Sequence, residues 1–353
     1  MLLCLVALLL NGCETIGYYN QAIRGQLSLM LSGESVDALL AAEATDAGLR
    51  DKLRLSIEAR RFARDELALP VGNAFTDYVD LDRRWVLVNV VAAPEFSLEP
   101  LTWCYPVVGC QSYRGYFDVD MAKARARELN AEGYDTFIAG VTAYSTLGWF
   151  EDPLHTGFTS LPDERMVALI FHELAHRVVY VDGDTAFNES FATAVELEGL
   201  RLWSERRDDS RAFEAAQTRL AQRNQTLALV ERQSRKLEAL YARRKTLKES
   251  ALRKRKSAIF AELIDAYNAL SRNWTQPGPF GTSPSDLNNA NLALFRQYSQ
   301  HVPGFRQMLR AGDHDFEHFY EQVRSLANQP REQRDETLSQ LREGTRSSAS
   351  STD

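Results

Sequence analysis

Apolar positions along the chain predict a largely helical protein that contains one small sheet. Residues 36–69 place Ala and Leu at helical spacing, which predicts one or two helices. The β-rich run at 85–92 predicts a buried strand, residues 113–119 and 136–147 also have strand character, and a helix is expected at 120–132. We therefore expect an α+β fold that is predominantly helical.

Two more helices are expected after this sheet. Residues 160–164 combine a capping hydroxyl, an early Pro and two acids, which is typical of a helix start. This helix should continue to about Val181, because the polar segment 182–184 contains a Gly that ends it. The next helix is expected from about 185 to beyond 200.

A long, charged stretch without Gly or Pro follows at about 208–270. Its Leu residues form a partial apolar seam, which predicts a helical hairpin or a long arm. Segment 201–262 holds 17 Lys and Arg against 8 Asp and Glu. Such charges usually form a solvated face, and contact with anionic lipid headgroups or a partner is the alternative. Further helices are expected at 286–299 and on to about 327.

Composition limits the class of protein. The chain has 353 residues and is 44% hydrophobic, which is enough for one large or two ordinary domains with a core. A net charge of −7 argues against nucleic acid as the main partner. No apolar run reaches the roughly 18 to 20 residues that a membrane-spanning helix needs.

The N-terminus resembles a bacterial lipoprotein signal. Residues 1–10 are nearly all apolar and lead into Leu-Asn-Gly-Cys, which is similar to the lipobox that ends at the lipidated Cys. We expect a signal peptide at 1–12, lipidation of Cys13 and a membrane anchor in the cell envelope. Glu14 follows Cys13. An Asp at this position would favour retention in the inner membrane, so the periplasmic face of the outer membrane is favoured instead. A buried N-terminal helix with an ordinary cysteine is the alternative.

Two cysteines remain beyond this signal, Cys104 and Cys110. The residues between them include a Pro and a Gly that can turn the chain back on itself. In an oxidising compartment such a pair is expected to form a disulfide. A metal site is less favoured, because no second cysteine pair or neighbouring His completes it.

The strongest chemical motif is His-Glu-Leu-Ala-His at 172–176. Residues four apart on a helix share a face, so His172 and His176 can bind one ion. Glu173 is offset from them and can reach a water on that ion. This division of roles is what a zinc hydrolase needs, since neutral imidazoles hold the metal and a carboxylate takes the proton.

A third ligand is available in the next helix. Glu189 lies thirteen residues after His176, where a tight helix–turn–helix can bring it to the ion. Glu196 lies seven residues further, two turns along the same face, and with Asn188 is expected to support the site or bind substrate. Asp182 is the competing ligand, as in HExxHxxGxxD proteases, but that pattern needs Gly where this chain has Val179. We therefore favour Glu189.

The segment AFNESFATAVE at 186–196 resembles the NExxA segment of gluzincin aminopeptidases. A wider pattern is similar to a family of bacterial predicted zinc aminopeptidases that are often lipoproteins. The likeness covers most of residues 13–325. Its segments are WCYPVVGC, YRGYF, HELAH and LNNA, followed by Tyr298 and by Val302-Pro303. The resemblance implies one zinc per chain, held by His172, His176 and Glu189, with Glu173 as the catalytic residue.

This resemblance implies a gluzincin-like metallopeptidase core with a small sheet beside the HExxH helix. The expected parts of the chain are a signal peptide at 1–12, a tether and first helix at 13–35, the core at 36–204, the helical arm at 205–270, a C-terminal helical part completing the cleft at 271–330 and a disordered tail at 331–353.

The leading hypothesis is a zinc-dependent peptidase, expected to be an aminopeptidase. Zinc-bound water would cleave a peptide substrate, with Glu173 as general base. Tyr298 is the first candidate for oxyanion stabilisation, and an acid at 151 or 152 for binding an α-amine. Endopeptidase activity stays open, because the exopeptidase signature GxMEN is absent. The alternatives are a non-catalytic metal-binding lipoprotein and the hydrolysis of a cell-wall amide.

Overall fold

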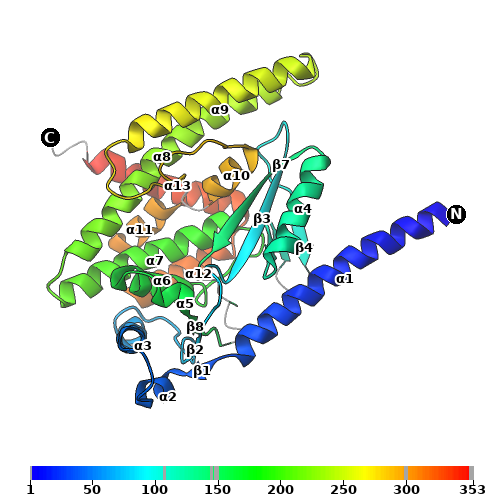
Figure 1. The fold of residues 1–353 in the computed structure, drawn as a ribbon. Helices are drawn as coiled ribbons and strands as arrows, with labels where there is room; N and C mark the ends of the chain where they lie inside the picture. Colours follow the sequence, from blue (N-terminus) through cyan, green and yellow to red (C-terminus); the bar gives the residue numbers. More distant parts are fainter. Residues whose placement is uncertain (1, 106–108, 144–145, 147–150, 298–300, 350–353) are drawn as a thin grey trace.

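The computed structural model describes residues 2–105, 109–143, 146, 151–297 and 301–349, with side chains from 15 to 342 within these ranges (Figure 1). Helices make up most of the described chain, and the strands form small sheets. The predicted α+β, predominantly helical class is therefore confirmed.

The main sheet has three antiparallel strands in the order β6-β3-β7, and Figure 1 shows β3 beside β7. Its central strand β3 (Leu87–Pro94) lies between β6 (Arg114–Tyr116) and β7 (Tyr134–Val141). Alternate residues of β3 pack against α4 (Val119–Ala131), as expected for a pleated strand with one face on a helix. The three predicted strands all exist, although those expected at 113–119 and 136–147 are shorter than the pattern suggested.

A second, smaller sheet lies near the N-terminal helices. It pairs β2 (Asp77–Val79) with β1 (Glu34–Ser35) on one side and with β8 (Leu154–His155) on the other. Three helices surround it: α2 (Val36–Ala41), α3 (Ala47–Asp65) and α5 (Thr156–Thr159). The predicted helical region 36–69 thus contains two helices.

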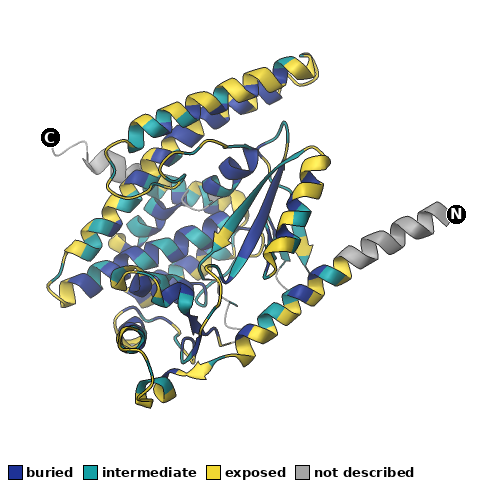
Figure 2. Ribbon diagram, viewed as in Figure 1, coloured by how far each residue is buried: buried dark blue, intermediate teal, exposed yellow. Residues whose placement is uncertain are grey.

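The core of the protein is a group of helices packed around α7 (Thr185–Arg206). This helix is buried on nearly all sides, between α6 (Asp163–Ala175), α8 (Arg211–Tyr241), α10 (Asn289–Gln297) and α11 (Val302–Ala311) (Figure 2). A helix without a polar face is stable only when other elements surround it. Aromatic rings fill the contacts, with Phe191 against Phe305, Phe319 and Tyr320, the last two from α12 (Phe316–Ala327).

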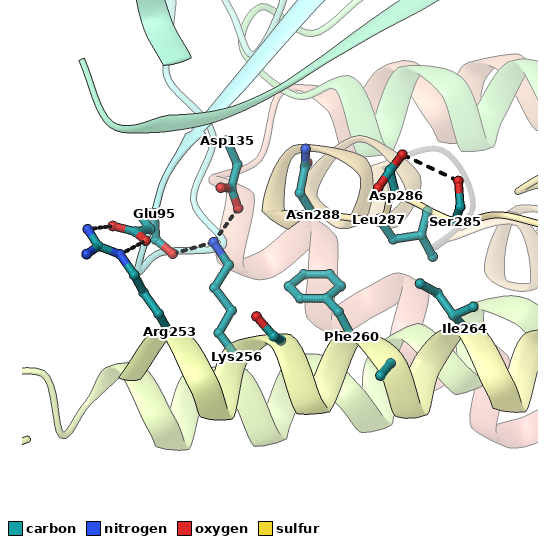
Figure 3. A pocket seen from close by; sticks show the side chains of 12 residues that line it. Glu95, Asp135, Arg253, Lys256, Phe260, Ile264, Ser285, Asp286, Leu287 and Asn288 are labelled. Atoms are coloured by element: carbon teal, nitrogen blue, oxygen red, sulfur yellow. Dashed lines mark hydrogen bonds and ion pairs between the residues drawn. The ribbon is translucent and has the colours of Figure 1, made fainter. Parts of the chain in front are cut away.

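Residues 211–271 form a helical hairpin of α8 (Arg211–Tyr241) and α9 (Glu249–Ser271). Apolar side chains of the two helices build a second core with Leu237 and Leu263 fully buried. The base of α9 is fixed to the sheet by ion pairs, since Arg253 binds Glu95 and Lys256 binds Asp135 at 2.6 Å (Figure 3). These residues line a cavity of about 430 Å³ between α9 and residues 285–288.

The prediction of a disordered tail at 331–353 is wrong for residues 331–349, which form helix α13 (Arg331–Ala349). This helix packs on α11, where the backbone of Leu338 would lie 2.5 Å from a Cβ placed on Gly304. Arg334 forms a 2.6 Å ion pair with Asp184, and both side chains are almost fully buried. Two specific contacts thus order a segment whose composition is polar.

The N-terminal helix α1 (Leu2–Leu31) includes Cys13 in one continuous helix. One face of its C-terminal half packs on the sheet, with Tyr18 and Leu29 buried. Within the described residues, no helix combines the length and apolar character needed to cross a membrane. The signal peptide and the lipidation of Cys13 stay predictions.

Candidate metal centre

Helices α6 and α7 carry the chemical motif and lie against each other in the core. Asp163 and Glu164 lie in the first turn of α6, where carboxylates stabilise the exposed amides. The helix ends at Ala175 with His176 as its C-cap, and so is shorter than the predicted helix to Val181. Tight backbone bonds from Arg177 and Val178 to residues three before them close the helix at this point.

The turn between the two helices is fixed by side chains of α7. Asn188 binds both backbone groups of Val181, donating to its carbonyl and accepting from its N–H, each at 2.8 Å. Asp184 caps α7 by accepting from the N–H of Phe187 at 3.1 Å. Asn188, predicted to support the site or to bind substrate, therefore holds the turn that sets Glu189 against α6.

His172, His176 and Glu189 lie together. Each offers a ligand atom, and these atoms all lie within 4.8 Å of one another. Nε2 of His172 is 3.4 Å from Oε2 of Glu189, and Nε2 of His176 is 3.8 Å from Oε1. Ligands about 2.0–2.1 Å from a tetrahedral zinc lie roughly 3.4 Å apart, so the three side chains fit such an ion with little movement.

Glu196 orients His172. Its Oε2 accepts a hydrogen bond from Nδ1 of His172 at 3.1 Å, which leaves Nε2 of that ring for a metal. Metal-binding histidines usually donate their other N–H to a carboxylate in this way. The seven-residue step from Glu189 to Glu196 places both acids on one face of α7, with one acid at each nitrogen of the same imidazole.

The electrostatics of this cluster favour a cation. Burial lowers the pKa of His172, but hydrogen bonds to Glu189 and Glu196 outweigh it and hold this pKa well above its usual value. Burial raises the pKa of Glu189, yet His172 and His176 lower it overall. Two carboxylates therefore attract positive charge to the point between the histidines, and the donor set of two imidazoles and a carboxylate matches catalytic zinc sites.

Glu173 lies beside the cluster and is buried, with 6% of its surface exposed. Burial raises its pKa to about 8, and the charges of Glu189, Asp152 and Glu196 raise it against the opposing effect of His172. A divalent cation held by the ligands would add positive charge nearby and lower this pKa. Glu173 can then act as a base near neutral pH.

A sequence model of one protein family, described as "Putative aminopeptidase", matches residues 17–338. The chain belongs to this family. The family description supports peptidase activity in general, and the matched range includes every residue of the metal cluster. Neither a curated protein nor a solved structure matches the chain at a significant level.

A disulfide-linked hairpin in this family member packs against the α6–α7 turn. Cys104 and Cys110 form the disulfide between β4 (Trp103–Tyr105) and β5 (Gly109–Gln111). Gly109 has a φ of +65°, and a Cβ there would lie 1.7 Å from Asp182. Asp182, the competing third ligand, thus lies against the hairpin and outside the group formed by the histidines and Glu189.

Two tyrosines near the cluster are additions that sequence reasoning missed. Burial raises the pKa of Tyr113, and the charges of Glu189 and Glu173 raise it further, so its hydroxyl stays neutral and lies within electrostatic reach of both acids. Tyr180 accepts a hydrogen bond from Gln111 at 2.9 Å and also lies within electrostatic reach of Glu189. Tyr113 belongs to the YRGYF segment, and Tyr180 follows the second His by four residues.

The remaining predicted residues are placed as follows. Tyr298 lies outside the described residues. Asp152 is buried, and both its carboxylate oxygens lie 3.1 Å from the N–H of Thr146, while its charge reaches Glu173. Glu151 is exposed and accepts from Asn73. Of the two acids, only Asp152 lies in the surroundings of the cluster.

The cavity between α9 and residues 285–288 is separate from this centre. Its lining contains none of the residues of this cluster, and two of its charged side chains on α9, Arg253 and Lys256, pair with Glu95 and Asp135 at the sheet (Figure 3). Lys256 also donates to the carbonyl of Glu95 at 2.8 Å. These bonds fix the helical hairpin to the sheet, and we assign the cavity no part in the chemistry.

Proposed function

We propose that the protein is a zinc-dependent peptidase, and specifically an aminopeptidase. The observation that carries this proposal is the cluster of His172, His176 and Glu189 with a separate, buried carboxylate beside it, that of Glu173. A purely structural zinc would be enclosed by its ligands and would need no buried acid beside it. The family description supports the peptidase class.

A zinc ion at this cluster would supply Lewis-acid chemistry, polarising the scissile carbonyl and making water more acidic. Glu196 would keep the proton of His172 on Nδ1, so that Nε2 stays a ligand throughout the reaction. Glu173 would take the proton of the attacking water at its carboxylate and return it to the nitrogen of the leaving amine.

Tyr113 and Tyr180 would supply hydrogen bonds to the carbonyl oxygen as it gains negative charge. Their hydroxyls stay protonated because burial raises the pKa of both side chains. The disulfide between Cys104 and Cys110 would fix the hairpin from which Gln111 holds Tyr180.

Substrate binding would use groups already near the site. Strand β7 lies at the edge of the sheet order β6-β3-β7 and can pair with an extended peptide. The buried carboxylate of Asp152 would favour a substrate with a positively charged α-amine close to Glu173. This acid is the feature that favours aminopeptidase over endopeptidase activity.

The test uses the full chain purified in detergent, with hydrolysis of aminoacyl-amide fluorogenic substrates as the readout. Glu173→Gln should lower turnover about 10²- to 10⁴-fold while zinc content is retained. Glu164→Gln, on the first turn of the same helix, is the matched control and should retain turnover. Zinc without turnover on free-amine or blocked peptides would favour the non-catalytic metal-binding protein.

A further inference from the structure

Helix α1 carries an exposed apolar stripe along its outer side. The stripe consists of six large side chains that are 37% to 82% exposed: Ile16, Tyr19, Ile23, Leu27, Met30 and Leu31. At about 100° of rotation per residue, these positions fall within a sector roughly 120° wide. Scattered apolar residues are normal on a surface, but here six of the seven positions in one sector are apolar, Asn20 being the exception, and such a stripe marks a contact surface.

The opposite face of α1 packs against the rest of the protein, so the stripe faces away from it. Arg114 places its guanidinium 3.9 Å from the ring centre of Tyr18. The N–H of Phe117 donates to Gln21 at 2.9 Å. A Cβ on Gly25 would lie 2.1 Å from the ring of Phe117, so only glycine allows this close approach. The helix therefore cannot turn the stripe inward without losing these contacts.

A polar pocket of about 600 Å³ runs beside the stripe. Arg24 and Arg83 supply its positive charge, and its single acid, Asp118, accepts hydrogen bonds from the first amides of α4. Arg24 is exposed and has no ion pair among the described residues. Cationic side chains beside an apolar helix face are the arrangement by which a helix lies in the headgroup region of an anionic bilayer.

We propose that α1 lies along an anionic phospholipid surface. The apolar stripe enters the boundary of the acyl chains, Tyr19 lies at the level of the headgroups, and Arg24 and Arg83 face lipid phosphates. Lipid is the expected occupant, because the cationic side chains of Arg24 and Arg83 lie at the edge of the apolar stripe and complement an anionic surface. This inference is independent of the peptidase activity.

The test is photolabelling of the full chain, reconstituted into vesicles of phosphatidylethanolamine and phosphatidylglycerol that contain a carbene-generating lipid. Trypsin cleaves after Arg24 and Arg50, so peptide 25–50 reports on Leu27, Met30 and Leu31 without the apolar residues at 2–10. Labelling of this peptide is the expected result. Labelling confined to residues 1–24 would overturn the proposal.

Variants make the test specific. Combined Ile23→Glu and Leu27→Glu should lower labelling of peptide 25–50 about tenfold or more, because two buried apolar contacts are lost. Arg83→Glu, which leaves the tryptic site after Arg24 intact, should lower it on these vesicles, and Ile57→Glu, at an exposed apolar position on α3, is the control that should not. Unchanged labelling in the combined Ile23→Glu and Leu27→Glu variant, or a detergent-stable dimer that Ile23→Glu dissociates, would contradict a lipid-facing stripe.

Discussion

Glu189 and Glu196 lie two turns apart on α7 and contact opposite nitrogens of one imidazole, that of His172. Glu189 is the proposed third metal ligand, and Glu196 fixes the tautomer of the ring. Substitution of Glu196 should therefore change metal affinity without removing a ligand.

Glu196→Ala should weaken zinc binding about 10- to 100-fold, because Nδ1 of His172 loses the carboxylate that orients it. Competition with a chromophoric chelator measures this affinity. Glu205→Gln, an exposed position on the same helix, should bind zinc as the wild type does. Equal affinity in Glu196→Ala would show that the hydrogen bond has no part in metal binding.

Tyr113→Phe should lower kcat about 10- to 100-fold with zinc content unchanged, because the reaction loses one donor to the developing oxyanion. Steady-state kinetics and metal analysis of the same sample check this together. Tyr19→Phe, on the surface of α1, should leave both kcat and zinc content unchanged. A kcat for Tyr113→Phe equal to that of the wild type would assign oxyanion stabilisation to other residues.

His155 predicts an acid-sensitive contribution to stability. Burial lowers its pKa to about 4, and its Nδ1 accepts a hydrogen bond from the N–H of Gly157 at 3.1 Å. The folded protein keeps the ring neutral while the unfolded chain protonates it below its usual pKa. This stabilisation is therefore complete above about pH 6.5 and is lost as pH falls toward 4, by on the order of 3 kcal/mol.

Urea unfolding of wild type and His155→Asn across this range measures the effect. Asn can still accept from Gly157 but does not titrate, so its stability should fall less steeply between about pH 6.5 and 4. Parallel curves for the two proteins would mean that His155 has the same pKa in both states.

Gly199 sets the close packing of α6 on α7. A Cβ at this position would lie 2.7 Å from Leu67 and 2.8 Å from the ring of Phe171. Gly199→Ala should lower the free energy of unfolding by about 1–3 kcal/mol through overpacking. Combining it with Phe171→Leu should cost less than the sum of the single changes, because the smaller side chain makes room. Strict additivity in thermal unfolding would contradict this contact.

The juxtaposition of His172, His176 and Glu189 could be predicted from the sequence because its geometry is local. His172 and His176 are one helical turn apart, and Glu189 and Glu196 are two turns apart on the next helix. What the pattern leaves open is how the short turn at 177–184 orients the second helix against the first. In the structure, Asn188 fixes this orientation by hydrogen bonding to both backbone groups of Val181. Glu196 was expected to support the site or to bind substrate, and its bond to Nδ1 of His172 matches the supporting role.

Features that depend on contacts between distant segments were missed. Tyr113 lies between β5 and β6, about 60 residues before His172 in the sequence, and no local pattern marks its electrostatic reach to Glu189 and Glu173. The helix α13 looked like a polar tail, yet it is ordered by Leu338 against Gly304 and by the ion pair of Arg334 with Asp184. Amino-acid composition cannot predict that this segment is ordered, because its order depends on these two contacts.

The most direct test of the proposed metal centre is zinc content after dialysis, measured for the full chain and for two variants. The wild type should retain about one zinc, Asp182→Asn should retain it equally, and Glu189→Ala should lose most of it. Zinc retained in Glu189→Ala and lost in Asp182→Asn would contradict the cluster of His172, His176 and Glu189, and would assign the third ligand to the turn between the helices.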